Sequence, residues 1–113
     1  MALCNSCNPA FVTIGQSIGA HDFYRYFQAF GLTERTGIDL PGEGAGISHS
    51  EDDLGPIQLA VSSFGQTFTV TPIQMITAVA AVANGGYLVQ PHLVNRIIDD
   101  DGNIIKATDT IVK

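Results

Sequence analysis

The sequence predicts a mainly α-helical chain with a short antiparallel β piece, which is an α+β fold. Two segments, Asn8-Pro9 and Thr71-Pro72, place proline directly after a capping residue, and each indicates the start of a helix. Asp101-Gly102 lies between two apolar runs and indicates a β-hairpin near the C-terminus. The length of 113 residues is enough for one domain and too small for two.

The composition argues against several classes of protein. Hydrophobic residues make up 45% of the chain and charged residues 14%, the opposite of the balance found in disordered chains. A net charge of −6 with scattered basic residues argues against binding to nucleic acid or to an anionic membrane surface. No apolar run approaches the length of a transmembrane helix, and no signal-like segment precedes the first helix. If the protein works outside the cytoplasm, we expect the exporting segment to lie outside this sequence.

The N-terminal part is predicted to form two helices with a very short connection. Asn8 is expected to cap the first helix, and Gly19 to end it. Asp22 is expected to cap the second helix, and Gly31 to end it. Apolar residues at helical spacing put Phe11, Ile14 and Ile18 on one face of the first helix. On the second helix Phe23, Tyr26, Phe27 and Phe30 form an aromatic stripe that is expected to lie in the core.

Residues 32–54 show no sustained period and are predicted to form a mobile surface loop. Gly42, Gly44 and Gly46 have the spacing of a phosphate-binding loop. Such a loop needs a helix directly after it, and a polar run, His49 to Asp53, follows instead. Irregular segments of this length within a small domain tend to be functional or displaced insertions.

Two further helices are predicted after the loop. Gly55-Pro56 begins a short helix over residues 57–64, which Gly65 ends. The strongest local signal is the capping box Thr71-Pro72-Ile73-Gln74. Its helix continues to Asn84 and is expected to be central and deeply buried, because small alanines recur along it and permit close packing.

Strands are predicted at residues 87–89 and 93–98, and residues 95–98 are expected to turn back into 104–106 as a hairpin. The turn, Asp99 to Asn103, is similar to a calcium-binding loop. Aligning its glycine with that of a calcium loop puts Ile97 at the first carboxylate position, so calcium binding is not expected there.

Cys4 and Cys7 form a C-x-x-C at the N-terminus, a spacing found in redox pairs and in zinc sites. A redox pair needs a buried strand before it, and only three residues precede Cys4. A zinc site needs four ligands, and the histidines lack metal-ligand spacing. We expect two ordinary thiols and no metal or cofactor, and a thiol module stays an alternative.

Ser6 and Asn8 are the best candidates for chemistry, because a complete hydrolytic triad and a paired-carboxylate site are both missing from the sequence. They flank Cys7 immediately before a helix, where unpaired N–H groups create positive potential. A hydroxyl and a carboxamide at this place can relay a proton and hold a substrate amide. The alternative is that Asn8 only caps the helix.

The order of short motifs along the chain resembles the penicillin-binding protein transpeptidase domain, of the class B type that acts in division, elongation or sporulation. The resemblance covers essentially all 113 residues. The segments that carry it are Asn5 to Phe11, Phe30-Gly31-Leu32, Thr36 to Glu43, Leu59 to Gln66, Val70 to Met75 and Ala83 to His92.

The resemblance implies a peptidoglycan D,D-transpeptidase that cross-links stem peptides through an acyl-serine and binds penicillin, within the fold shared with serine β-lactamases. It implies that Ser6 and Asn8 are catalytic and that Asn8 also binds substrate. It implies an extracytoplasmic location, with the membrane reached only through an N-terminal anchor outside this sequence. Stem peptides and β-lactams are the implied partners of the complete domain.

The family's Ser-x-x-Lys nucleophile and Lys-Ser/Thr-Gly strand are missing: no serine has lysine three places on, and Lys106-Ala107-Thr108 does not match. Residues 1–113 are therefore expected to be one partial domain, the helical subdomain plus the start of the sheet. Alone it should be inactive and form no penicilloyl adduct. It should also self-associate, because faces of the helices that contain Phe11 and Ile76 are uncovered and the terminal hairpin has an unpaired edge that permits strand pairing or swapping. A non-catalytic remnant that serves as a binding or scaffold element stays the alternative.

Overall fold

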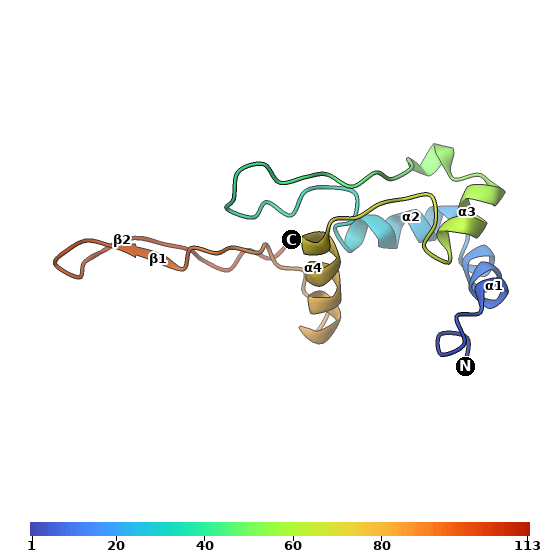
Figure 1. Ribbon diagram of the computed structural model, residues 1–113, viewed down its shortest axis with the longest axis horizontal. Helices are drawn as coiled ribbons and strands as arrows, with labels where there is room; N and C mark the ends of the chain where they lie inside the picture. Colours follow the sequence, from blue (N-terminus) through green and yellow to red (C-terminus); the bar gives the residue numbers. More distant parts are fainter.

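The computed structural model describes all 113 residues. The elements are α1 (Asn8–Ile18), α2 (Ala20–Ala29), a short 3-10 helix (η1, Glu51–Asp53), α3 (Pro56–Ser62), α4 (Pro72–Ala83), β1 (Arg96–Ile98) and β2 (Ile104–Ala107). The molecule is elongated, with the chain doubling back so that α3 lies beside α1 (Figure 1). The four predicted α-helices are all present. No helix combines the length and the apolar composition needed to cross a bilayer.

The joint between α1 and α2 is tighter than predicted. Helix α1 begins at Asn8 itself, and Cys7 occupies the capping position without a side-chain hydrogen bond, so the prediction that Asn8 is the cap is wrong by one residue. Gly19, with φ of +84°, both ends α1 and precedes α2. Only glycine adopts this conformation without strain. Asp22, predicted as the cap of α2, lies instead within its first turn.

The aromatic stripe of α2 is covered along only one of its edges, where Phe23 and Phe27 are half-buried. Phe27 packs edge-on against Phe68, with ring centroids 5.0 Å apart, and stacks on Phe23 at 6.3 Å. Tyr26 and Phe30 are exposed. The prediction that the stripe lies in the core is therefore wrong: α2 has no fully buried residue, and the edge with Tyr26 and Phe30 is exposed.

The predicted loop, residues 32–54, is confirmed as irregular chain up to η1. Hydrogen bonds hold together the part of it from residue 36 to residue 47. The carboxylate of Glu43 accepts from the backbone N–H and the hydroxyl of Thr36, both at 2.6 Å, and from the N–H of Gly37 at 3.1 Å. Further along, Ile47 pairs with Thr69 in a single antiparallel bridge. These contacts hold residues 36–47 against the rest of the chain.

Helix α4 begins at the predicted capping box. The Thr71 hydroxyl accepts from the Gln74 N–H at 3.2 Å, and Gln74 Oε1 accepts from the Thr71 N–H at 2.8 Å. The Gln74 side chain also donates to the backbone carbonyl of Glu34 at 2.6 Å, and it is almost fully buried. One glutamine therefore fixes the helix start and anchors residues of the distant loop.

The predicted deep burial of α4 is wrong. Ile76, Val79 and Val82 are 60%, 56% and 71% exposed. Only Gln74, Ala78 and Ala81 are buried, along one line of the helix. The helix stands in the middle of the chain in Figure 1, but its outward side has no neighbour.

The hairpin is confirmed, with Arg96 opposite Ala107, Ile97 opposite Lys106, and an irregularity before Ile98. The predicted strand at 87–89 is not formed: only Val89 pairs, in a single bridge to Val112. Residues 93–95 also lie outside β1. The N–H groups of Leu93 and Val94 donate to the Asp39 carboxylate, at 2.7 and 2.9 Å, and not to a neighbouring strand.

The overall shape is extended. The radius of gyration is 17.9 Å, against about 13 Å for a compact domain of this length. Only 8 of 113 residues are buried. The hairpin projects alone from the body at one end, and α1 and α3 lie together at the other (Figure 1). The chain therefore has small local clusters in place of one continuous core.

Candidate active site

Ser6 lies at the top of a tight N-terminal turn that leads directly into α1. The turn is closed by backbone bonds from Asn5 to Met1 and from Cys7 to Ala2, at 3.1 and 3.0 Å. Ser6 has φ of +49°, in the left-handed region that a non-glycine residue adopts at a cost. Such strain is typical of residues whose side chain must point in one particular direction.

The Asn8 side chain is not used to cap the helix, since the capping position belongs to Cys7 and no side-chain bond caps α1. This removes the structural alternative for Asn8. Ser6 and Asn8 are both exposed, so their hydroxyl and carboxamide are available to a ligand.

Ser6 and Asn8 line one open hollow of about 280 Å³ together with residues from the end of α3. The hollow has polar side chains from Ser6, Asn8 and Ser63 and apolar ones from Leu3, Phe11 and Phe64. Ser63 and Phe64 shape the hollow from the α3 side, and the sequence did not single them out, because the contact between α1 and α3 joins residues far apart in the chain.

The hollow can bind and relay but cannot start a reaction by itself. Its lining includes no lysine, histidine or carboxylate that would activate a nucleophile. It offers the hydroxyl of Ser6, the amide of Asn8 and the N-terminal end of α1, whose free N–H groups favour negative charge. These groups suit a proton relay and the binding of a peptide amide.

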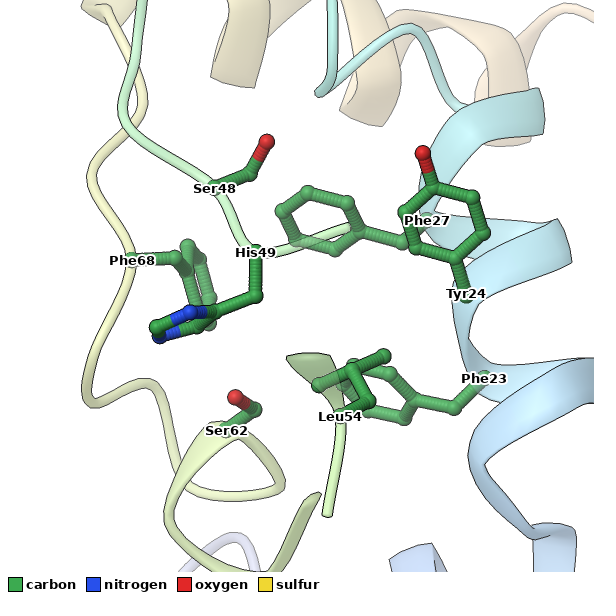
Figure 2. A pocket seen from close by; sticks show the side chains of 8 residues that line it. All are labelled: Phe23, Tyr24, Phe27, Ser48, His49, Leu54, Ser62 and Phe68. Atoms are coloured by element: carbon green, nitrogen blue, oxygen red, sulfur yellow. The ribbon is translucent and has the colours of Figure 1, made fainter. Parts of the chain in front are cut away.

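A second, smaller pocket lies between α2, α3 and the end of the loop, and Figure 2 shows its aromatic walls. His49 enters it, and its Nε2 atom is buried without a hydrogen-bond partner. The nearby hydroxyl of Ser62 pairs with Thr67 at 3.1 Å. The space amounts to about 10 Å³, room for one water molecule, so this pocket serves packing rather than substrate binding.

Cys4 and Cys7 are free thiols, the first exposed and the second half-buried. No group of three or more histidine, cysteine, aspartate or glutamate side chains converges as a metal site would require. Cys7 lies inside the Ser6–Asn8 motif, so its exposure reports on the position of the motif.

Similarity to solved structures defines the fold class. Penicillin binding protein 3 from Mycobacterium tuberculosis, complexed with aztreonam, superposes with a TM-score of 0.83 at 31% identity, covering 94% of this chain and 24% of that one. A peptidoglycan synthetase from Bifidobacterium adolescentis superposes at 0.86 with 28% identity, covering 96% and 20%. The helices and hairpin are thus arranged as in penicillin-binding transpeptidase domains, which confirms the predicted α+β fold.

The chain belongs to the penicillin binding protein transpeptidase domain family, which it matches over residues 1–113. Stage V sporulation protein D of Bacillus subtilis is 45% identical over 95 residues, covering 84% of this chain and 15% of that protein. Penicillin-binding protein H of the same organism is 44% identical over 72 residues, covering 64% and 10%. The chain therefore spans a small part of the length of these relatives, and the family that the motifs predicted is confirmed.

Proposed function

We propose that this chain is the helical segment of a peptidoglycan D,D-transpeptidase, one partial domain that also includes the start of the sheet. The observation that carries the proposal is the pair Ser6 and Asn8, presented free at the start of α1 in a chain of this family. Related proteins are named peptidoglycan D,D-transpeptidases, such as PbpA of Mycolicibacterium smegmatis, 35% identical over 112 residues.

In the proposed reaction, a serine from outside these 113 residues attacks the D-Ala-D-Ala carbonyl and becomes acylated. The Ser6 hydroxyl passes the proton between the nucleophile and the leaving amine, and ends the cycle with its own proton restored. The Asn8 carboxamide can both donate to a carbonyl and accept from an N–H, so it aligns the substrate amide. Stem peptides and β-lactams are the proposed ligands, met on the extracytoplasmic face of the membrane.

The test is a chimera of stage V sporulation protein D of B. subtilis, in which residues 1–113 replace the corresponding segment of that protein. We expect the chimera to be acylated by a fluorescent penicillin. Ser6→Ala should lower the acylation rate by about 100-fold or more, since positioned proton transfer contributes about 10²–10⁴-fold. Asn5→Ala, an exposed change in the same turn, is the matched control and should leave the rate unchanged.

The alternative function is a non-catalytic binding or scaffold element that keeps the fold. The same chimera separates the two functions. A chimera that folds with the thermal stability of its parent but is never acylated would support the scaffold and contradict the transpeptidase.

A further inference from the structure

Helix α1 and helix α3 fit together through a notch at Gly15. Gly15 is the only buried residue of α1. A methyl group added at its Cα would lie 1.7 Å from Ser63 Oγ and 2.8 Å from Ser63 Cβ. The side chain of Ser63 therefore occupies the space that any other residue at position 15 would fill.

Ser63 is fixed in this notch from its own side. Its hydroxyl donates to the Leu59 carbonyl, one turn back, at 2.7 Å. Leu59 is among the few buried apolar residues of the chain. The hydroxyl therefore cannot swing away without losing its acceptor, and a larger residue at position 15 would have to displace the backbone of α1.

Both helices that meet at the notch also contribute residues to the candidate active site. Ser63 and Phe64 line the hollow from the α3 side, and Ser6 and Asn8 line it from the start of α1. The helical stretch from Asn8 to Gly15 is two turns of one rigid element. A shift at the notch is therefore passed to Asn8 and to the turn that contains Ser6.

We propose that Gly15 and Ser63 are positioning residues for the transpeptidase site: their interlock sets where Ser6 and Asn8 stand across the hollow from Ser63 and Phe64. The catalytic part of this inference rests on the proposed function. The geometric part rests only on the packing of α1 against α3.

The test compares Gly15→Ala, Ser63→Gly and the double variant in the chimera defined above. Alanine is a better helix former than glycine, so local propensity alone predicts no harm from Gly15→Ala. We expect the opposite, a fall in penicillin acylation of about 10- to 100-fold, because ångström-scale misplacement has effects of that size. Ser63→Gly removes the atoms that clash, so the double variant should recover to within a few-fold of the parent.

Gln16→Ala, an exposed change beside Gly15, is the matched control and should acylate normally. Acylation is measured well below each variant's melting temperature, so that unfolding does not contribute. If Gly15→Ala is acylated as fast as the parent chimera, the inference is overturned. A loss that Ser63→Gly fails to rescue would overturn it too, since the loss would then come from elsewhere.

The half-buried Cys7 supplies a readout that does not depend on catalysis. In the same proteins, peptide mass spectrometry gives the alkylation rate of Cys7 relative to the exposed Cys4. This ratio should rise in Gly15→Ala and return to the parent value in the double variant. If the parent chimera is not acylated, the proposed function fails. The alkylation ratio still shows whether the contact between Gly15 and Ser63 positions the Ser6–Asn8 motif. An unchanged ratio in Gly15→Ala would refute that positioning role.

Discussion

Glu43 is the carboxylate with the most donors at the base of the 36–47 loop. Bonds from the Thr36 hydroxyl and from the N–H groups of Thr36 and Gly37 hold its pKa below the ordinary value of 4.5. Asp39 behaves alike, because the N–H groups of Leu93 and Val94 donate to it and lower its pKa. At both positions the folded chain favours the charged form.

A lowered pKa makes the loop sensitive to acid. The stabilising contribution of Glu43 is present at neutral pH and is lost as the pH falls below 4.5 and through the lowered value. We expect the amide protons of Thr36 and Gly37 to lose their hydrogen-exchange protection in that range. Glu43→Gln should remove the pH dependence, and the exposed Glu34→Gln should keep it. Protection that does not change with pH in the parent chain would contradict the assignment.

In the proposed reaction Ser6 relays a proton and the nucleophile lies outside these 113 residues, so Ser6 should not react with β-lactams. Incubating the 113-residue protein with benzylpenicillin should leave its intact mass unchanged. Its hollow contains no base that would raise the reactivity of the Ser6 hydroxyl. The complete stage V sporulation protein D, treated in parallel, is the positive control. A penicilloyl mass on Ser6 would show that it is itself a nucleophile.

At the scale of elements, the start of α4 depends on one capping pair. Thr71→Ala removes the acceptor for the Gln74 N–H and should lower the free energy of unfolding by about 1 kcal/mol. Thr71→Ser keeps the hydroxyl and should therefore keep most of the free energy of unfolding that the cap contributes. Urea denaturation followed by circular dichroism measures the difference, with the exposed Thr110→Ala as control. Equal effects of the two alanine variants would mean that the cap contributes nothing.

The same helix shows what the sequence can predict. Its start was predictable because a capping box is written within four consecutive residues, and the Asp101-Gly102 hairpin is equally local. The burial of α4 could not be predicted, because burial depends on which segments of the chain lie against the helix. The notch between Gly15 and Ser63 escaped prediction for the same reason. Ser6 and Asn8 could be predicted as site residues because their motif is contiguous, whereas the sequence does not show that Cys7, rather than Asn8, occupies the capping position.

At the scale of the whole molecule, apolar surface remains uncovered in several places, among them α4 and the hairpin. The outward side of α4 exposes Ile76, Val79 and Val82. The hairpin exposes every residue of both strands, and a two-stranded sheet with free edges is marginally stable alone. In an extended chain with few buried residues, these surfaces are available to a second copy.

We therefore expect the 113-residue protein to self-associate, with an average mass in analytical ultracentrifugation that rises with concentration. Val82→Lys on α4 and Ile105→Lys on β2 place a charge on surfaces that are 71% and 67% exposed, so neither should disturb the fold. Ser17→Lys, on an exposed polar position of α1, is the matched control and should associate like the parent. Whichever apolar-surface variant lowers the mass identifies the interface, because a desolvated lysine opposes association there. A parent that stays monomeric at high concentration would show that the exposed surface alone does not drive association.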